Sequence, residues 1–351
     1  MNNHNSTIKE DNINIDYGLT GLANLGNTCY INSCMQILSH CELFNNLLNS
    51  LNINKLNNID DSILLVEWKQ LKELMWKNNC TIAPNRFLKT IHHVSRQKNL
   101  EIFSGYAQND LPEFLMFLID SFNNSLKRKV KMNIIGVQKN NTDKLAIECY
   151  KMIKEYYSEN YSELLDIFYG IHVSVIENCE NNETLVNKPE PFCLLDLPIP
   201  EKDNISIYDC FDFYLNKEVL SGENKFFDSK NNNYIDVYKY ILFWNLPNIL
   251  IINLKRFDNN NKKIKKIINC PLTNIDLTKY VIGYDKETYI YELFGITNHF
   301  GGSTGGHYTS YVKHNTSKNW YHFNDTNVSQ INESSINNQN AYTFFLKKVN
   351  I

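Results

Sequence analysis

The chain has 351 residues, of which 43% are hydrophobic and 21% are charged. This apolar share can build a sizeable core, which excludes a wholly disordered chain. The formal net charge of -3 argues against a generally basic nucleic-acid binder. No apolar run approaches the roughly 20 residues that a membrane-spanning helix needs, and the N-terminus lacks the pattern of a secretory signal. We therefore expect a monomeric intracellular protein, cytoplasmic or nuclear, that binds neither nucleic acid nor membrane.

The nine cysteines indicate a reduced protein rather than a disulfide scaffold. Their number is odd, and the chain is far longer than a disulfide-stapled miniprotein. No C-x-x-C pair occurs, although such pairs are the usual sequence sign of a structural zinc. We expect no metal and no cofactor, and we expect most of the thiols to be small core residues.

Helices are predicted mainly in the N-terminal half. Residues 1–17 are polar and rich in Asn, so they predict a disordered tail. Further along, apolar residues recur at helical spacing, which predicts helices over residues 30–40, 60–76, 112–122 and 145–165. The polar stretch at 123–144 is expected to be an exposed connection.

Strands are predicted in the C-terminal half, where β-branched and aromatic runs alternate with turn residues. The most apolar run is ILIINL at 249–254, which predicts a central strand. Because helices precede strands instead of alternating with them, the fold class is predicted to be α+β. The predicted strands cover residues 168–176, 194–199, 238–244, 249–257, 289–297, 307–314 and 341–347.

One cysteine lies where a loop passes into a predicted helix. The segment NLGNTCY at 24–30 places Cys29 directly before the helix at 30–40. A thiol there faces free backbone N–H groups and the positive end of the helix. Such sites lower the pKa of cysteine from about 8.5 to roughly 3.5–7.5. We therefore expect Cys29 to be a thiolate nucleophile, with a buried structural cysteine as the alternative.

A candidate base lies near the other end of the chain. The segment GGSTGGHY at 301–308 places His307 after a glycine-rich loop, which leaves room for the backbone of a ligand. Downstream, WYHFND at 320–325 ends in Asn324 and Asp325, and either side chain could accept a hydrogen bond from the imidazole. Nucleophile, base and orienting group together predict covalent catalysis, although each feature alone could be an ordinary loop or turn.

Five motifs, which occupy six segments, resemble those of the ubiquitin-specific proteases, which are papain-like cysteine deubiquitinases with a thumb, a palm and fingers. Their cysteine box is similar to GLANLGNTCYINSCMQ at 21–36, and their histidine box to NHFGGSTGGHYTSYV at 298–312 with WYHFNDTNVS at 320–329. The Gln/Asp box between them resembles GYAQNDLPEFLMFL at 105–118. Two core strands of the family resemble LPNILIINLKRF at 246–257 and AYTFFL at 341–346. The segments follow the order that the family has.

This resemblance implies the α+β, papain-like fold of the family in one catalytic domain at 18–349. It implies a helical thumb at about 18–165, β-strand fingers at about 168–246 and a β-rich palm mainly at about 247–349.

The resemblance also implies catalytic roles. Cys29 matches the nucleophile, His307 the general base and Asn324 the third member of the triad. Asp325 matches a neighbouring acidic residue that shares or takes over that third role. Asn24 matches the side-chain amide of the oxyanion hole, where a neutral amide can stabilise an oxyanion without competing for the proton.

Substrate binding is implied in the same way, with ubiquitin and ubiquitinated proteins as partners. The tail of ubiquitin is rich in Arg and ends in Gly-Gly, so its two glycines can pass a channel that larger side chains would block. Asp110 and Glu113 match acidic positions that clamp tail arginines in relatives, although both could simply stabilise the start of a helix. Gln108, His299 and Tyr308 match further positions that line the cleft.

The chain departs from many relatives at the fingertip, where they hold a zinc ion with two C-x-x-C pairs. The matching places fall near Asn178 and Asn181, where Cys179 stands alone, and at Asp228 and Asn231. A tetrahedral zinc site needs about four soft or imidazole ligands. We therefore expect no structural zinc, and fingers held together by strand packing alone.

The expected function is thiol-dependent hydrolysis of the isopeptide or peptide bond after the C-terminal glycine of ubiquitin, through an acyl-enzyme. Three alternatives stay open: a catalytically weak ubiquitin-binding scaffold, a protease for another ubiquitin-like modifier, and an unrelated Cys-His acyltransferase. The presence of Cys29, His307 and Asn24 disfavours the scaffold. The Gln/Asp segment and the strand segments disfavour the acyltransferase.

Overall fold

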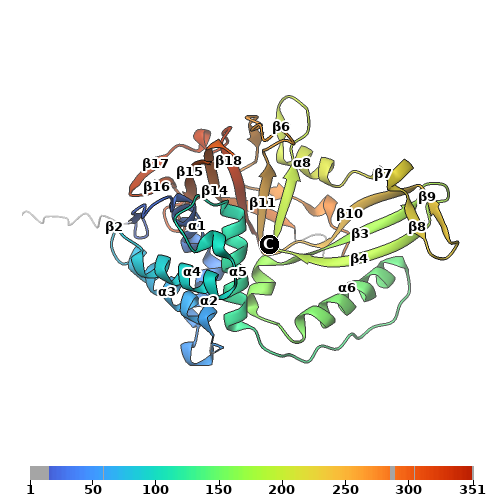
Figure 1. Ribbon diagram of the computed structural model, residues 1–351, viewed down its shortest axis with the longest axis horizontal. Coiled ribbons are helices and arrows are strands. Elements are labelled where there is room, and N and C mark those ends of the chain that lie inside the picture. Colours follow the sequence, from blue (N-terminus) through green and yellow to red (C-terminus); the bar gives the residue numbers. More distant parts are fainter. Residues whose placement is uncertain (1–15, 58, 285–288, 304, 350–351) are drawn as a thin grey trace, which may run out of the picture.

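Helices fill the N-terminal half of the chain and strands the C-terminal half, in a computed structural model that describes residues 16–349 except 58, 285–288 and 304 (Figure 1). The α+β prediction is therefore confirmed. Most of the predicted disordered tail, residues 1–15, lies outside the described residues. Its last two residues are anchored, since the carbonyl oxygen of Tyr17 accepts a hydrogen bond from His314 Nε2 at 2.8 Å and that of Asp16 accepts one from Asn79 Nδ2 at 2.6 Å.

Five helices build the thumb: α1 (Cys29–His40), α2 (Glu42–Ser50), α3 (Asp60–Met75), α4 (Asn85–Gln97) and α5 (Leu111–Leu126). The helices predicted at 30–40, 60–76 and 112–122 are thus confirmed as α1, α3 and α5. All twelve residues of α1 are buried, because this helix packs against α5 and against three strands of the large sheet. Polar side chains of α1 form hydrogen bonds in the interior. For example, Gln36 Nε2 donates to the carbonyl oxygen of Thr20 at 2.7 Å.

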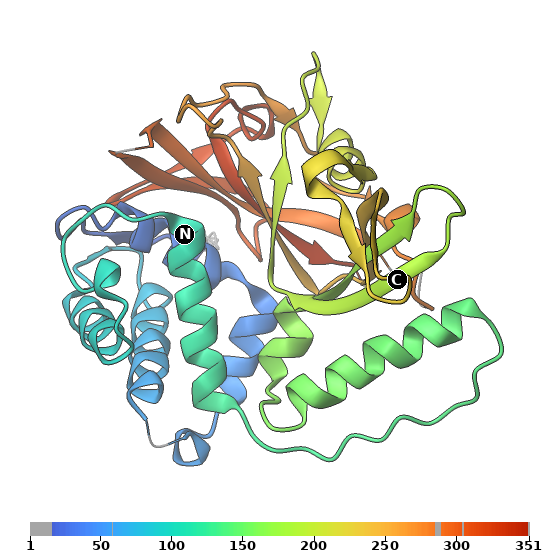
Figure 2. The ribbon, with the colours of Figure 1, turned by 45° about the vertical axis from the view of Figure 1, so that its right-hand side comes forward.

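The helix predicted at 145–165 is two helices, α6 (Asn141–Tyr157) and α7 (Glu163–Phe168). The break occurs because Tyr161 exchanges backbone hydrogen bonds with Arg128, at 2.9 and 3.1 Å, and because the Ser162 hydroxyl caps α7 by accepting from Leu164 N at 3.2 Å. Figure 2 shows α6 set apart from the thumb helices at the end of a long connection. That connection is shorter than predicted, since α5 runs to Leu126 and α6 begins at Asn141.

The largest sheet, here called the palm sheet, has the strand order β17-β16-β15-β14-β18-β11-β5, with β13 paired to β14. Its only parallel pair among the described residues is β11 with β5. The strand predicted at 249–257 lies between two neighbours, which confirms its central place. The bounds are β5 (Leu194–Pro198), β11 (Ile249–Lys255), β13 (Ile275–Asp276), β14 (Ile290–Gly302), β15 (Gly305–Lys313), β16 (Trp320–Asn324), β17 (Asn327–Ile331) and β18 (Ala341–Lys348).

The fingers are a sheet with the strand order β4-β3-β10-β7, namely β4 (Thr184–Phe192), β3 (Gly170–Asn178), β10 (Val237–Asn245) and β7 (Glu218–Leu220). Helix α6 covers one face of this sheet, where Ala146 and Cys149 pack with Val173, Val175 and Trp244. The hairpin of β8 (Phe226–Asp228) and β9 (Asn233–Ile235) lies at the far tip in Figure 1.

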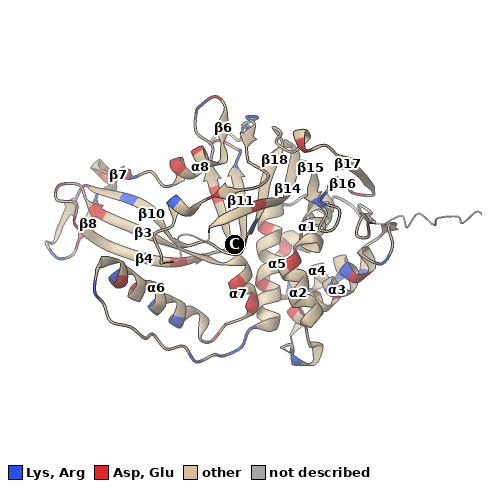
Figure 3. Ribbon diagram, turned by 180° about the vertical axis from the view of Figure 1, so that it is seen from behind, with Lys and Arg blue, Asp and Glu red and all other residues tan. Residues whose placement is uncertain are grey.

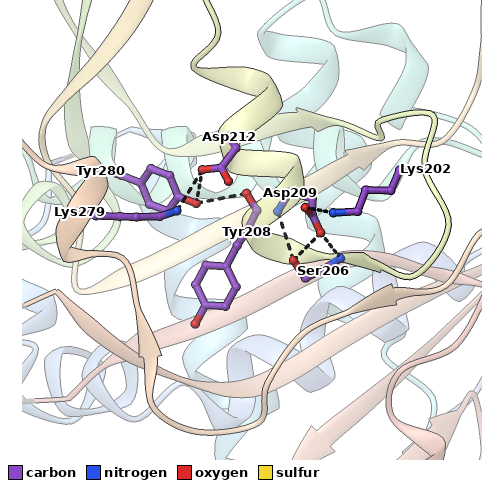
Figure 4. A network of polar contacts seen from close by, with 7 residues as sticks. All are labelled: Lys202, Ser206, Tyr208, Asp209, Asp212, Lys279 and Tyr280. Carbon is purple, nitrogen blue, oxygen red and sulfur yellow. Dashed lines mark hydrogen bonds and ion pairs between the residues drawn. The ribbon is translucent and has the colours of Figure 1, made fainter.

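The predicted fingers range of 168–246 needs one correction. Strand β5 and helix α8 (Ile207–Tyr214) lie inside that range but belong to the palm, because β5 pairs with β11 and α8 packs against β5. A polar network fixes α8 (Figure 4): Ser206 and Asp209 form a capping box, Lys202 pairs with Asp209, and Tyr280 Oη donates to Asp212 at 2.7 Å. Helix α8 therefore supports the edge strand β5 from the side away from the thumb.

The remaining elements are short. They are the strands β1 (Gly21–Leu22), β2 (Thr81–Ile82), β6 (Ile205–Ser206) and β12 (Ile268–Asn269), and the 3-10 helices η1 (Ile53–Lys55), η2 (Glu101–Phe103), η3 (Gly222–Asn224), η4 (Thr278–Tyr280) and η6 (Glu333–Ser335). Within the described part of the chain, no helix is both long and apolar enough to cross a membrane. Figure 3 shows basic and acidic positions interspersed over the helical and the strand-rich halves.

Candidate active site

The loop before α1 is shaped by its own side chains. Gly26 and Asn27 both have positive φ, at 103° and 55°, a region that glycine and asparagine tolerate best. The Oδ1 atom of Asn24 accepts hydrogen bonds from the backbone N–H groups of Gly26 and Thr28, each at 3.1 Å. These bonds fix the side chain of Asn24 and leave its Nδ2 group to donate elsewhere.

Cys29 is the first residue of α1, one position inside a helix that was predicted to begin at residue 30, and its thiol is buried, with 3% exposure. Burial raises the pKa of Cys29, and the negative charge of Asp325 raises it further. The backbone N–H groups of Tyr308, Tyr30 and Cys29 act in the opposite direction. The net direction is upward, so the prediction of a lowered pKa at this helix N-terminus is wrong for the free protein, because desolvation outweighs the helix end.

The strand β15 brings His307 to the same place. Helix α1 packs against β15, and the backbone N–H of Tyr308, the residue after His307, faces the Cys29 sulfur. No hydrogen bond joins Cys29 and His307 in the described structure. His307 Nε2 lies 2.7 Å from Asn324 Oδ1 at the end of β16. Since an amide oxygen can only accept, Nε2 carries the proton and Nδ1 is the free basic nitrogen.

Asp325 has a different role from Asn324. It adopts a left-handed φ of 50° in the turn after β16, and its carboxylate points toward the α1 side of the site. Oδ2 accepts from Asn24 Nδ2 at 3.0 Å, and Oδ1 accepts from Asn32 Nδ2 at 2.8 Å. Of the two candidate partners for the imidazole, the structure therefore joins Asn324 to His307 and joins Asp325 to Asn24.

A cavity of about 330 Å³ adjoins Cys29. Four of the predicted substrate-binding residues line it together with Cys29, namely Gln108, Asp110, His299 and Tyr308. The fifth, Glu113, lies in the first turn of α5, is exposed and is not part of the lining. Tail-binding roles for these residues stay predictions, and Glu113 has the weakest geometric support.

The cavity lies between the loop before α5 and the β14–β15 hairpin. Gln108 Oε1 accepts a hydrogen bond from Gly306 N at 2.7 Å, which joins the loop before α5 to the hairpin. A Cβ atom on Gly306 would lie 2.3 Å from both His299 Nε2 and the Phe300 carbonyl oxygen. Only glycine fits at this position without a shift of its neighbours.

Asp110 is held by two tyrosines. Tyr308 Oη donates to Asp110 Oδ1 at 2.7 Å, and the hydroxyl of Tyr342 also hydrogen-bonds to this carboxylate. Burial raises the pKa of Asp110 in spite of these donors. Two protein hydroxyl groups therefore already occupy its carboxylate, which weakens the prediction that Asp110 helps to clamp an arginine.

His299 forms the back of the cavity. It is buried, and its ring lies 4.7 Å from the ring of Tyr308 and 5.4 Å from that of Tyr342. Burial, and the positive charge of Lys263, lower the pKa of His299 to about 4. A neutral imidazole at neutral pH suits a wall of the cavity better than a charged contact.

The residues at the fingertip do not fit a structural zinc. The carboxylate of Asp228 accepts from Lys230 N at 2.9 Å and from Asn231 Nδ2 at 2.7 Å, so it closes its own turn. In the described residues, no group of three or more His, Cys, Asp and Glu side chains could hold a metal ion. Lys217, directly before β7, forms an ion pair with Glu177 on β3, with Nζ 2.5 Å from the carboxylate. The prediction that strand packing alone holds the fingers together is therefore incomplete.

The sequence predictions missed several residues of the site. Tyr342 and Phe257 line the cavity, although both were placed only in core strands. Asn32 is 2% exposed and donates to Asp325, to Leu22 O at 3.2 Å and to Ala23 O at 3.3 Å. A polar residue on the buried face of an amphipathic helix was the available signal for Asn32.

Comparison with known proteins identifies relatives along nearly the whole chain. The family model described as Ubiquitin carboxyl-terminal hydrolase matches residues 20–346. Ubiquitin carboxyl-terminal hydrolase Usp2 of Drosophila melanogaster is 30% identical over 336 residues, which are 94% of this chain and 35% of that protein. Ubiquitin carboxyl-terminal hydrolase 2 is 30% identical in Bos taurus, over 93% of this chain and 55% of that protein, and 31% identical in Gallus gallus, over 93% of each.

Solved structures show the same fold. A SAGA DUB module with Ubp8, bound to monoubiquitin, matches with a TM-score of 0.72 and 22% identity, over 96% of this chain and 70% of that chain. The module bound to ubiquitin aldehyde matches with a TM-score of 0.72 and 24% identity over the same shares. The predicted fold class is confirmed by this likeness. The chain spans about a third to a half of the length of the Drosophila and bovine relatives.

Proposed function

The chain belongs to the ubiquitin carboxyl-terminal hydrolase family, and we propose that it is a thiol-dependent deubiquitinase. Its substrate is the isopeptide or peptide bond that follows the C-terminal glycine of ubiquitin. The observation that carries this proposal is the single site formed by Cys29, the His307–Asn324 pair and the glycine-walled cavity. Cys29 and His307 lie near opposite ends of the sequence, and the proposal is supported by the packing of α1, which begins with Cys29, against β15, which carries His307.

The first step is activation of the thiol. Because burial raises the pKa of Cys29, the free protein holds it as a neutral thiol at neutral pH. Asn324 keeps the proton of His307 on Nε2, so Nδ1 can accept the proton of the thiol as the sulfur attacks the carbonyl carbon of the terminal glycine. Among the described residues no hydrogen bond joins the two groups, so this step requires the thiol and Nδ1 to approach each other when the substrate is bound.

The second step is stabilisation of the oxyanion. Asn24 Nδ2 carries two hydrogens, and one of them is committed to Asp325 at 3.0 Å. The other is available to the oxyanion, together with the backbone N–H of Cys29 at the start of α1. Loss of one such donor in other enzymes costs about 10²–10³-fold in rate. Asp325 would thus act on the reaction by orienting Asn24.

The third step releases the products. The protonated His307 gives its Nδ1 proton to the leaving lysine amine as the carbon–nitrogen bond breaks, which leaves a thioester on Cys29. A water molecule then loses a proton to His307 and attacks the thioester carbonyl. The carbon–sulfur bond breaks, the C-terminus of ubiquitin leaves as a carboxylic acid that ionises in solution, and His307 returns its proton to the thiolate of Cys29.

Hydrolysis of a fluorogenic C-terminal amide of ubiquitin tests the proposal, with linkage-defined diubiquitins as natural substrates. We expect release of the fluorophore by the chain and none by Cys29→Ala. Binding of ubiquitin without any turnover would support the scaffold instead. Turnover of another modifier's amide, without turnover of ubiquitin's, would reassign the substrate.

A further inference from the structure

A row of polar side chains extends over three adjacent strands of the palm sheet, from its β5 edge inward, on the side that faces the thumb. On β11, Ile249 and Ile251 pack into the core shared with the thumb helices, whereas Leu250, Ile252 and Leu254 pack into the core on the opposite side. Alternation along a strand therefore turns Asn253 toward the thumb. At this residue the apolar stripe ends, and a polar surface begins.

Strand pairing extends this row in both directions. Asn253 is directly opposite Asp196 on β5 and opposite Thr343 on β18. Leu195 and Leu197 pack into the far core, so Asp196 lies on the thumb side of β5. The row therefore runs from the edge strand β5 through Asp196, Asn253 and Thr343 toward the middle of the sheet.

The row leads to the cavity beside Cys29. Tyr342, the residue before Thr343, lines that cavity and hydrogen-bonds to Asp110. Asp196 lies close enough for its negative charge to raise the pKa values of Asp110 and Tyr342. The path from β5 to β15 crosses β11, β18 and β14, so a peptide that reaches Cys29 from the β5 edge passes over this row.

Asp196 is held in place and has no cation of its own. Its Oδ1 atom accepts from Asn253 Nδ2 at 2.7 Å, and Asn253 Oδ1 in turn accepts from Thr343 Oγ1 at 3.4 Å. Asn253 and Thr343 are buried, while Asp196 is exposed. No ion pair to Asp196 occurs among the described residues, and Lys255, two residues beyond Asn253 on β11, does not supply one. A fixed, solvent-facing carboxylate that lacks a cationic partner suits a cationic ligand.

The distance between β5 and β15 determines which part of the substrate Asp196 can meet. Four strand spacings of about 4.8 Å separate β5 from β15, roughly 19 Å in all. An extended peptide covers that length in about six residues. A basic side chain within about six residues of the scissile carbonyl can therefore reach Asp196.

We propose that Asp196, positioned by Asn253, binds a basic side chain in the tail of the substrate and is a specificity-determining residue of the site. The inference rests on the proposed function, since it assumes that the tail enters along the palm sheet. Asp196 thus offers the tail a carboxylate in addition to that of Asp110, whose own oxygens accept hydrogen bonds from Tyr308 and Tyr342.

Steady-state hydrolysis of the fluorogenic ubiquitin amide by the full chain tests the proposal. Asp196→Asn keeps an oxygen that can accept from Asn253, so the fold should persist while the charge is lost. We expect KM to rise about fivefold with kcat within about twofold, and a larger rise in KM for Asp196→Lys. Glu201→Lys, an exposed carboxylate beyond the end of β5, is the matched control and should leave KM within about twofold.

A charge swap distinguishes recognition from structure. Ubiquitin with its tail arginines changed to glutamate should be a better substrate for Asp196→Lys than for the unmodified chain. An unchanged KM for both Asp196 variants, or a loss that does not depend on the charge of the tail, would overturn the inference. If the unmodified chain does not hydrolyse ubiquitin, the affinity of the Cys29→Ala chain for ubiquitin, with and without Asp196→Asn, decides the role of Asp196 separately from catalysis.

Discussion

Substitution of Gly306 by alanine tests how tightly the β14–β15 hairpin is packed where it lines the cavity beside Cys29. The added Cβ would lie 2.3 Å from His299 Nε2 and 2.3 Å from the Phe300 carbonyl oxygen. Ordinary van der Waals contact begins at 3.4 Å, so one side must move by 3.4 - 2.3 = 1.1 Å. Because Gly306 precedes His307, that movement displaces the general base or the wall that faces it.

The size of the effect follows from this displacement. A misplacement of about 1 Å in an active site can cost on the order of 10²-fold in rate, which corresponds to about 2.7 kcal/mol in the activation free energy. Overpacking costs about 1–3 kcal/mol of stability, less than the roughly 5–15 kcal/mol that keeps a domain folded. Gly306→Ala should therefore remain folded and lose activity.

The assay is hydrolysis of the ubiquitin amide at equal concentrations of folded protein, with urea unfolding to measure stability. We expect kcat/KM to fall about 100-fold for Gly306→Ala. Gly105→Ala is the control, since no atom lies within 4 Å of a Cβ atom at that position and Gly105 does not line the cavity. If folded Gly306→Ala keeps its activity within about threefold of that of the unmodified chain, the close packing at Gly306 does not determine the placement of His307, and the reasoning is refuted.

Three further predictions concern charge. Asp325→Asn should shift the pH profile of Cys29 alkylation by iodoacetamide to lower pH, because the charge of Asp325 raises the pKa of the thiol, and should still slow hydrolysis by up to about 10²-fold, because Asn24 is held less firmly. Burial lowers the pKa of His40 to about 4. In the unfolded state His40 has a pKa of about 6.5, so between pH 6.5 and about pH 4 the unfolded state binds one proton more than the folded state. The free energy of unfolding should therefore fall by about 3 kcal/mol as the pH falls from about 6.5 to about 4. His40→Gln should remove this part of the pH dependence of the free energy of unfolding, measured by urea unfolding at each pH. Lys217→Met should destabilise the fingers by about 1 kcal/mol, because Glu177 loses its cation, and added zinc should not restore the thermal midpoint.

Local patterns predicted the parts of the site that depend on neighbouring residues. A glycine-containing loop before an amphipathic helix located Cys29, and a glycine-rich hairpin located His307. Both features arise within a few residues, so they can be read without knowledge of the fold. The same is true of α1, α3 and α5, whose apolar spacing is regular over three turns or more.

Features that depend on distant contacts could not be predicted in this way. The pKa of Cys29 was expected to be lowered by the helix end, but β15 buries the thiol and reverses the direction. The sequence could not distinguish Asn324 from Asp325 as the hydrogen-bond partner of His307. In the structure the left-handed turn at Asp325 directs its carboxylate to Asn24, whereas Asn324 bonds to His307. The place of β5 in the palm sheet depends on its pairing with β11, which lies more than fifty residues further along the chain.

The central claim is that the sulfur of Cys29 attacks the terminal carbonyl of ubiquitin with help from His307. Ubiquitin that carries a C-terminal electrophile measures this most directly, because the adduct can be located by mass spectrometry of the digested protein. The account predicts one adduct on Cys29, much slower labelling of His307→Ala and no labelling of Cys29→Ala. A folded chain that forms no adduct, or forms it on another cysteine such as the exposed Cys80, would contradict the account.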